Sequence, residues 1–358
     1  MQRNLFILLP APTQTGPIKG ALALANALYE EFHITIVYLK SGSGQLPDTK
    51  VNVRQIILNQ RGLFGIHKYF SYRKLLKNGA LHNEPISLSM CFSADFVNAF
   101  CGKFARTICS IRGDLLKNYH FDYGAPGLLL ALFHLWMTKF FSDVISMSNC
   151  MAIQIKRYSC RSCVVIPNFV DEGSLEPYRA LHRYRGAAFR FVFVGSLSIR
   201  KQPMLVLSAF NLLVKRGLDA HLDIVGDGHL KPALIALASK LRINDRVKIW
   251  GWCPDPLPIV TAADTLVLPS LSEGQPRAAL EALYLGIPCI LRSLEEHATL
   301  LSRPGSGLFF TDDNRLVEKM EIMVKRGFAA DRVRRCLLPT RHRVKYAVEK
   351  YMELLSSK

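Results

Sequence analysis

The chain has 358 residues, which is long for one hydrophobic core and sufficient for two domains of ordinary size. Its hydrophobic fraction of 49% argues against a disordered protein, and its net charge of +18 favours anionic partners such as nucleic acid, acidic lipid or phosphorylated substrates. The nine cysteines are scattered, and the single Cys-x-x-Cys at residues 160–163 has no histidine ligands near it. This pattern argues against a zinc site and favours reduced thiols.

Two apolar segments are too short for membrane insertion or secretion. Residues 5–9 are shorter than the apolar core of a signal peptide and are followed by Pro10. Residues 127–141 contain His134 and Lys139 and fall short of the roughly 20 residues that a span needs. We therefore expect a cytoplasmic protein that is soluble or peripheral on a membrane surface.

In the first half of the chain, short apolar runs alternate with helical patterns. The expected strands are residues 4–9, 33–39, 86–88, 106–111, 143–148 and 164–171. The expected helices are residues 20–32, 93–104 and 127–141, with a further helix beginning at residue 150. Continuous apolar strands separated by helices predict a doubly wound parallel sheet that starts with a βαβ unit.

The second half repeats this architecture after a basic, irregular stretch. Residues 172–190 contain Pro177 and four arginines, so we place the domain boundary between residues 186 and 187. The expected strands are residues 191–197, 220–225, 247–250, 265–268 and a segment around residue 289. The expected helices are residues 201–215, 230–241, 343–355, a short one near residue 259 and one within residues 270–283. The alternation predicts a second doubly wound sheet, with ligand at the carboxyl ends of its strands.

One strand-to-helix turn in the second half carries two glutamates. Glu273 follows the expected strand at residues 265–268, and Glu281 lies inside the next helix. The first N–H groups of a helix attract anions, and carboxylates accept hydrogen bonds from sugar hydroxyls, so the turn suits an anionic, polyhydroxylated ligand. Two isolated glutamates would be better explained by an acid favouring the helix dipole and a surface residue.

The two glutamates belong to a longer pattern, Glu-Gly-x-Pro-x-x-x-Leu-Glu-Ala-Leu-x-x-Gly-x-Pro. This pattern resembles the E-x7-E motif of the family 4 glycosyltransferases, which are retaining enzymes of the GT-B fold. The agreement extends to Gly274, Pro276, Leu280, Ala282, Gly286 and Pro288. The resemblance implies an α/β protein with two facing Rossmann-like domains and a cleft between them. Residues 1–186 would bind the acceptor and residues 187–340 the nucleotide sugar, while residues 341–358 would form a helix that crosses back to the first domain.

The resemblance also assigns roles around the turn. Glu273 would contact hydroxyls of the donor sugar, and Glu281 would bind the ribose hydroxyls of the nucleotide. The backbone expected to cradle the sugar and the diphosphate comprises Gly274, Gln275, Pro276, Arg277, Ala278 and Ala279.

A second family pattern, Gly-Arg-Leu-x-x-x-Lys, is similar to residues 195–201. Lys201 matches the diphosphate-binding lysine and Gly195 the glycine, whereas Ser196 replaces the arginine. Arg200 or Arg277 is expected to supply the missing positive charge. A lysine at a helix N-terminus opposes the helix dipole, which makes a purely structural role for Lys201 less favourable.

Two resemblances concern the first half. Gly16 matches the second glycine of the family's first glycine-rich turn, with Thr15 in place of the first, although a lone glycine turn could equally be structural. Arg112 occupies a position where many family members carry a histidine that faces the donor sugar and the acceptor. Arg112 and Asp114 are therefore candidates for either side of the reaction.

The implied chemistry needs no cofactor besides a UDP- or GDP-linked sugar. The expected cleft loops contain no Asp-x-Asp motif, and the family generally transfers sugar without a divalent ion, so we expect no metal site. The sequence offers no second acid on the far face of the sugar, which favours front-face transfer assisted by the leaving phosphate.

The acceptor is expected from the basic charge and the resemblance together. Residues 60–77 interleave aromatic and basic side chains, which suits an anionic membrane surface or, alternatively, an ordinary helix with its apolar stripe on the core. With the resemblance to bacterial polysaccharide members, this favours a lipid-linked glycan acceptor in the assembly of O antigen, capsule or lipopolysaccharide.

Three other functions are weighed against transfer. The replacements at Ser196 and Arg112 leave open a non-catalytic nucleotide-sugar-binding protein of the same fold. The charge suggests a nucleic-acid binder, but no zinc finger, RNP-type strand or helix-turn-helix accompanies it, so we expect no nucleic-acid partner. A phosphorylase or a sugar-nucleotide epimerase of this fold is less favoured by the motif.

Overall fold

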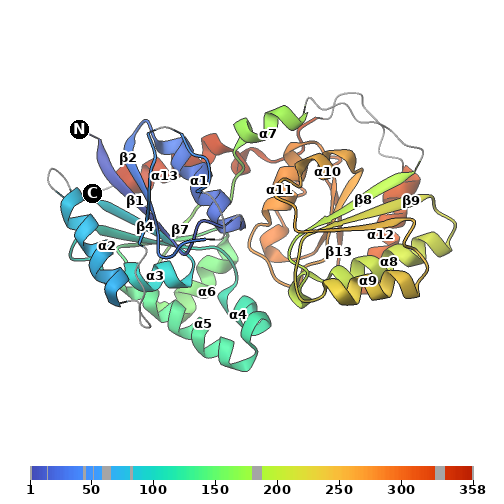
Figure 1. Ribbon diagram of the computed structural model, residues 1–358, viewed down its shortest axis with the longest axis horizontal. Helices are drawn as coiled ribbons and strands as arrows, with labels where there is room; N and C mark the ends of the chain where they lie inside the picture. The colour runs from blue at the N-terminus through green and yellow to red at the C-terminus, as the bar shows by residue number, and fades with distance from the viewer. Residues whose placement is uncertain are drawn as a thin grey trace. The chain divides into compact units, whose positions relative to one another are not determined.

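The structure, a computed structural model, describes residues 2–13, 15–42, 46–50, 52–58, 66–80, 84–179, 188–326 and 335–356. It divides into two compact units. Unit 1 comprises Met1–Phe169 with Val344–Lys358, and unit 2 comprises Val170–Arg343. Each unit is built around its own parallel sheet with helices packed against it (Figure 1). The predicted pair of doubly wound α/β domains is therefore confirmed.

Among the described residues, the sheet of unit 1 has seven parallel strands in the order β3-β2-β1-β4-β5-β6-β7. They are β1 (Arg3–Leu9), β2 (Phe32–Tyr38), β3 (Arg54–Ile57), β4 (Ile86–Met90), β5 (Arg106–Ile111), β6 (Asp143–Ser146) and β7 (Val164–Val165). The strand order reverses between β1 and β4, and open α/β sheets bind ligands at the carboxyl edge of such a switch point. Strand β3 was not predicted, and β7 is shorter than expected.

Helix α4 was not predicted, and the expected helices of unit 1 differ from the structure mainly at their ends. They are α1 (Gly16–Leu28), α2 (Ile66–Gly79), α3 (Phe92–Asn98), α4 (Leu115–Tyr123), α5 (Ala125–Met137), the 3-10 turn η1 (Thr138–Phe140), α6 (Asn149–Ser159) and α13 (Val344–Ser356). Helix α1 begins at Gly16, not at residue 20, because Pro17 suits a first turn whose N–H groups have no acceptor. None of the described helices is long and apolar enough to cross a bilayer.

The sheet of unit 2 has six parallel strands within the described residues, in the order β10-β9-β8-β11-β12-β13. They are β8 (Phe189–Val194), β9 (Ala220–Val225), β10 (Val247–Gly251), β11 (Thr265–Leu268), β12 (Cys289–Arg292) and β13 (Gly307–Phe310). The helices are α7 (Glu172–Arg179), α8 (Pro203–Lys215), α9 (Lys231–Lys240), α10 (Leu257–Ala262), α11 (Arg277–Tyr284) and α12 (Asp313–Arg326). The switch point lies between β8 and β11, and β13 and α12 were not predicted.

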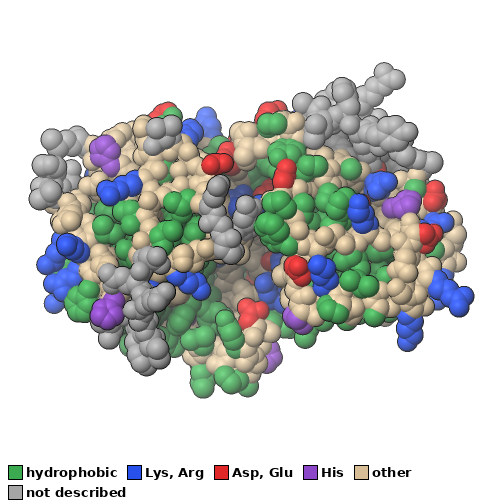
Figure 2. Space-filling model, in the orientation of Figure 1, with side chains coloured by type: hydrophobic (Ala, Val, Ile, Leu, Met, Phe, Trp, Pro, Cys, Tyr) green, Lys and Arg blue, Asp and Glu red, His purple; other side chains and the backbone are tan. Residues whose placement is uncertain are grey.

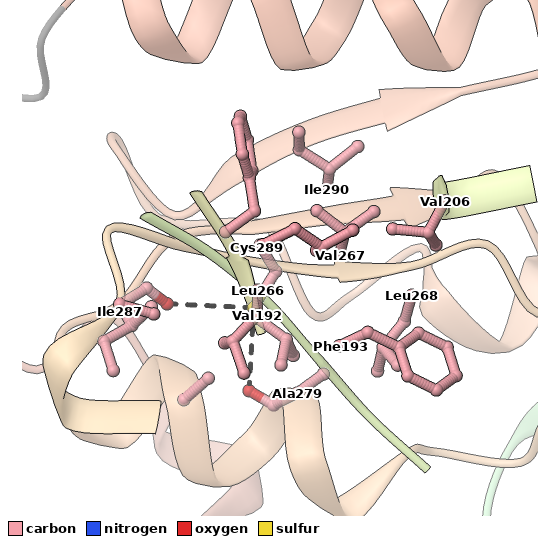
Figure 3. Packing of buried hydrophobic residues seen from close by; sticks show 14 of the residues in the cluster. Val192, Phe193, Val206, Leu266, Val267, Leu268, Ala279, Ile287, Cys289 and Ile290 are labelled. Atoms are coloured by element: carbon pink, nitrogen blue, oxygen red, sulfur yellow. Dashed lines mark hydrogen bonds between the residues drawn. The ribbon is translucent and has the colours of Figure 1, made fainter. Parts of the chain in front are cut away.

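The core of unit 2 holds α11 against the sheet (Figure 3). Leu266 and Leu268 of β11 and Val192 of β8 are fully buried, as is Ala279 of α11. The Cys289 thiol of β12 lies 3.9 Å from the carbonyl oxygen of Ala279, so the first turn of α11 packs directly on the central strands. This packing fixes the position of the loop that connects β11 to α11.

The boundary between the units lies between Phe169 and Val170, not between residues 186 and 187. The reason is that residues 172–179 form α7, whereas an irregular linker was expected. Leu175 is buried in the core of unit 2, and the Tyr284 hydroxyl of α11 donates a 2.5 Å hydrogen bond to Glu176. Residues 180–187, which include the expected boundary, lie outside the described residues.

Helix α13 returns the chain to unit 1. Ala347, Tyr351 and Leu355 are buried in the same core cluster as α1, and Arg3 donates a 2.9 Å hydrogen bond to the carbonyl oxygen of Leu355. The last turn of the helix is therefore tied to the first strand of the unit.

Candidate active site

Glycines bring the loops after β8 and β9 into backbone contact. A Cβ atom on Gly226 would lie 1.8 Å from the carbonyl oxygen of Gly195, and one on Gly228 would lie 2.5 Å from that of Leu197. Both Gly226 and Gly228 also have positive φ angles, 140° and 155°, which favour glycine. The loop with Gly195 thus packs closely on the turn formed by residues 226–228, to which the sequence analysis gave no role.

Glu273 is a buried carboxylate paired with two cations at this edge of the sheet. It lies between β11 and α11, and 6% of its surface is exposed. It forms an ion pair with the Lys201 ammonium, while Nη1 of Arg200 lies 3.8 Å from its Oε2. Both cations belong to the 3-10 turn η2 (Ile199–Lys201), which follows β8. The structure therefore brings together three predicted site residues from the two strands that flank the switch point.

The electrostatics keep Glu273 ionised. Burial by itself would raise the pKa of the carboxyl group, because desolvation disfavours the charged form. The charges of Lys201 and Arg200 and the hydrogen bond from Lys201 outweigh burial and lower the pKa below its ordinary value. At neutral pH the site therefore holds a fixed carboxylate that can accept hydrogen bonds from hydroxyl groups, beside Lys201 and Arg200.

Arg200 also fixes the loop before α11. Its guanidinium Nη1 donates to the carbonyl oxygen of Ser272 at 2.9 Å, and its own carbonyl oxygen accepts from the N–H of Leu271 at 2.8 Å. Gly274 and Pro276 are buried, and Pro276 is the residue that precedes the first turn of α11. The N-terminal end of α11 is therefore held beside η2, as a site for a diphosphate would require.

Arg277 and Glu281 form a second pair one turn apart on α11. Nη1 of Arg277 lies 3.6 Å from Oε1 of Glu281, and both side chains are largely buried. Burial lowers the pKa of the Arg277 guanidinium, which nevertheless stays charged at neutral pH. Its Nε and Nη2 atoms are buried without a hydrogen-bond partner among the described residues. Two unsatisfied donors at a helix N-terminus suit a ligand that brings its own acceptors.

The sequence analysis missed His297, which follows β12 in the 3-10 turn η3 (Glu295–His297). Its Nδ1 lies 2.9 Å from the carbonyl oxygen of Arg292, so Nδ1–H donates and Nε2 is the unprotonated acceptor. Burial lowers its pKa, and the charges of Glu273 and Lys201 act on it. Within the described structure, Nε2 has no hydrogen-bond partner. His297 lies a few residues after β12, and this position was the one sequence signal that could have indicated the residue.

The site residues expected in the first half lie in unit 1. Gly16 is the first residue of α1, and a Cβ atom there would meet nothing within 4 Å, so close backbone packing does not require a glycine. Arg112 follows β5, and its Nη2 donates to Oδ1 of Asn168 at 2.8 Å. Asp114 is the N-cap of α4, accepting from the N–H of Lys117 at 3.0 Å, and so has a structural role.

Unit 1 contains a fully buried acid, Asp95, at the centre of a polar cluster. Asp95 accepts from the Ser89 hydroxyl at 2.6 Å and from Nε2 of His134 at 3.0 Å, and the Tyr119 hydroxyl lies 2.9 Å from Nδ1 of the same histidine. Asp95, His134 and Cys109 form the one group of three potential metal ligands found among the described residues. Because Asp95 and His134 already satisfy each other, the cluster is explained as a stabilising hydrogen-bond network.

Part of the chain is similar to known glycosyltransferases. Residues 179–346 match the family model described as glycosyl transferases group 1. The chain is 32% identical over 155 residues to the Escherichia coli UDP-Gal:alpha-D-GlcNAc-diphosphoundecaprenol alpha-1,3-galactosyltransferase. The aligned stretch covers 40% of each protein. It is 32% identical over 119 residues to the lipopolysaccharide 1,6-galactosyltransferase of Salmonella typhimurium, covering 32% of this chain and 33% of that one. The matched stretches thus span two fifths or less of these relatives' length.

Solved structures match the chain from end to end. The crystal structure of Anabaena HepE in complex with UDP and glucose covers 100% of both chains with a TM-score of 0.76 at 15% identity. The two sheets, their switch points and this likeness define a protein of the GT-B fold class. Within this fold, residues 179–346 are similar to the glycosyl transferases group 1 family.

Proposed function

We propose that this protein is a glycosyltransferase that moves a hexosyl-type sugar from a UDP- or GDP-sugar to a lipid-linked or oligosaccharide acceptor of a bacterial surface polysaccharide. The observation that carries the proposal is the buried Glu273 carboxylate, kept ionised by Lys201 and Arg200 at the switch point of unit 2. The family match and a structural neighbour bound to UDP and glucose support a nucleotide-sugar donor.

The charges fit the departure of a nucleoside diphosphate. Positive groups that are fixed before the reaction stabilise negative charge as it develops, at no cost in reorganisation. An ammonium has three donors, so Lys201 can keep its ion pair with Glu273 and still donate to a phosphate oxygen. The unsatisfied donors of Arg277 lie at the start of α11, where the backbone also attracts anions. In this proposal Glu273 holds the hydroxyls of the transferred sugar, and Glu281 those of the ribose.

We further propose that transfer retains the anomeric configuration, needs no metal ion and follows the family 4 pattern. The spacing of Glu273 and Glu281 supports the last point, because one lies in the loop and the other on α11, as that pattern implies. Lys201 and Arg200 supply positive charge of the kind that a divalent ion supplies elsewhere. A carboxylate stabilised by two cations is a weak nucleophile, which favours front-face transfer over a covalent glycosyl-enzyme.

The proposed place of action is the cytoplasmic face of the inner membrane, as a peripheral protein. The Escherichia coli relative is named for a diphosphoundecaprenol-linked substrate, and the net charge of +18 favours an anionic surface. The apolar stripe of helix α2 faces the core, since Tyr72 and Leu76 are fully buried in unit 1, although Phe70 on the same helix is exposed. The structure thus favours the ordinary-helix interpretation for residues 66–77, while residues 60–65 lie outside the described residues.

The test is a panel of UDP- and GDP-sugars offered to the purified protein with a lipid-diphosphate-linked acceptor sugar. We expect one donor to be consumed, with a product of unchanged anomeric configuration by NMR and an unchanged rate in EDTA. An inverted product would contradict retention, and EDTA inhibition reversed by Mg²⁺ or Mn²⁺ would contradict metal independence. Tight binding of a UDP- or GDP-sugar without hydrolysis or transfer would instead favour the non-catalytic binding protein.

A further inference from the structure

Unit 1 exposes a continuous row of aromatic and aliphatic side chains that the proposed site does not use. We call it the aromatic ridge, and it consists of Phe96, Phe100, Leu129, Phe133, Trp136 and Phe140. Leu129 is 72% and Phe100 53% exposed, so these are not the edges of core residues. Figure 2 shows hydrophobic side chains gathered over α4 and α5, at the lower edge of unit 1.

The ridge is one surface and not a scatter of single residues. Ring centroids lie 5.5 Å apart for Phe96 and Phe100, 6.4 Å for Phe100 and Phe140, 4.8 Å for Phe140 and Trp136, and 5.8 Å for Trp136 and Phe133. The ring centroids of Phe133 and Phe96 lie 6.4 Å apart, so each of the five rings has two of the others as neighbours. Soluble proteins rarely expose a contiguous apolar surface of this kind without a binding partner.

Helix α5 is apolar on both of its faces, which is the origin of the ridge. Ala131 and Leu135 are fully buried against unit 1, while Leu129, Phe133 and Trp136 lie on the opposite, exposed side. A helix that is hydrophobic all round normally buries both faces. One of its faces is buried by the unit itself, so the other is available to a partner.

The surroundings of the ridge are basic. Helix α2 borders it, because the Tyr69 hydroxyl donates to the carbonyl oxygen of Phe100 at 3.4 Å and the Arg73 guanidinium lies 4.5 Å above the Phe104 ring. The basic side chains of α2, the loop after α3 and η1 are Lys68, Arg73, Lys74, Lys77, Lys103 and Lys139. Residues 66–79, 99–105 and 138–140 contain no Asp or Glu.

We propose that the aromatic ridge is the face on which this protein docks to an acidic phospholipid bilayer. The rings enter the interface between headgroups and acyl chains, where Trp and Phe are favoured, and the basic residues meet the anionic headgroups. A second copy of this chain is a poorer occupant, since it would present the same positive charge. The inference rests on the proposed lipid-linked acceptor and moves the membrane contact from the buried stripe of α2 to α3, α5 and η1.

The first test is flotation with phosphatidylcholine vesicles that contain or lack 30% phosphatidylglycerol. We expect wild type to float with the acidic vesicles, less so at high salt, and a Phe133→Ser, Trp136→Ser variant to lose at least tenfold in binding. Trp252→Ser is the matched control, because Trp252 is 63% exposed but lies in unit 2. A Lys103→Glu, Lys139→Glu variant should lose binding to acidic vesicles while leaving the apolar surface intact.

The second test uses only a conservative aromatic substitution in the ridge, so it stands even if the serine variant misfolds by circular dichroism. Lipids brominated near the headgroup should quench part of the wild-type tryptophan fluorescence, and Trp136→Phe should abolish the quenching while Trp250 and Trp252 remain. Failure of wild type to bind acidic vesicles, equal binding by the ridge variant, or a wild-type dimer that the ridge variant lacks would each overturn the proposal. Sugar transfer to a short water-soluble acceptor without vesicle binding would overturn docking alone, and vesicle binding without transfer would overturn only the proposed function.

Discussion

The two units share a doubly wound parallel sheet but differ in how each satisfies a buried acid. In unit 1, Asp95 accepts hydrogen bonds from the Ser89 hydroxyl and from the ring of His134. In unit 2, Glu273 is paired with Lys201 and Arg200. The Asp95 carboxyl group is thus held by a hydroxyl and a histidine ring, whereas Glu273 lies beside a lysine and an arginine. The comparison teaches that the fold alone does not place the chemistry, since fixed cations beside an acid occur at one switch point and a structural network in the other unit.

The largest predicted effect comes from breaking the charge cluster of unit 2. Glu273→Gln and Lys201→Ala should each lower kcat by a factor of about 100 to 1,000, as loss of one transition-state electrostatic contact costs about 3–4 kcal/mol. Steady-state kinetics on the donor found in the panel measures this, with thermal unfolding as the control for folding. Wild-type turnover in both variants would remove these residues from the reaction.

The matched change in unit 1 should affect stability and not chemistry. Asp95→Ala leaves the Ser89 hydroxyl and His134 buried without their acceptor, which we expect to lower the free energy of unfolding by about 1–3 kcal/mol. Below the unfolding transition, kcat should stay within about twofold of wild type, well short of a 1.4 kcal/mol effect. A large loss of kcat in a fully folded Asp95→Ala protein would mean that Asp95, like Glu273, contributes to the reaction.

Glu281→Ala should have a smaller effect, mainly on donor binding. Ribose contacts change little during the reaction, so their loss raises KM more than it lowers kcat. A rise of about tenfold in the donor KM would correspond to about 1.4 kcal/mol. An unchanged KM would take Glu281 out of the nucleotide site and leave it with a structural role beside Arg277.

The smallest predicted effect is a dependence of stability on pH. Burial lowers the pKa of His297 in the folded protein below its ordinary value of 6.5, so the unfolded chain binds a proton more readily. Stability from this residue is fully present above pH 6.5 and is lost as the pH falls through the lower folded value. The Glu273 pKa is also lowered, so its contribution is lost only below the ordinary value of 4.5. His297→Gln should therefore flatten the decline in thermal stability just below pH 6.5 and leave the more acidic decline unchanged.

Much of this architecture could be predicted because local pattern and burial agree. The bounds of β5, β9 and β11 match the predicted runs, since strands buried on both faces are continuous apolar segments that end at polar or turn residues. Glu273, Lys201 and Arg200 could be placed together because neighbouring strands of a parallel sheet present their carboxyl ends at one edge.

Other features depended on tertiary packing and could not be predicted. Helix α7 contains Pro177 and directly precedes an arginine-rich stretch, so only its contact with the core of unit 2 shows that it is not a linker. His297 belongs to no motif, and only the folded chain brings its ring near Glu273 and Lys201. The apolar sequence of α5 does not show that Leu129 and Trp136 remain exposed, because exposure depends on which faces the rest of unit 1 covers.

The most direct test of the account is a double-mutant cycle on the rate of sugar transfer with Glu273→Gln, Lys201→Ala and the combined variant. If the two residues act as one pre-organised unit at the donor site, the combined variant should be no slower than the slower single variant, because each single change already destroys the ion pair. Independent, multiplicative losses would contradict a shared unit. Full activity in the combined variant would contradict the site itself.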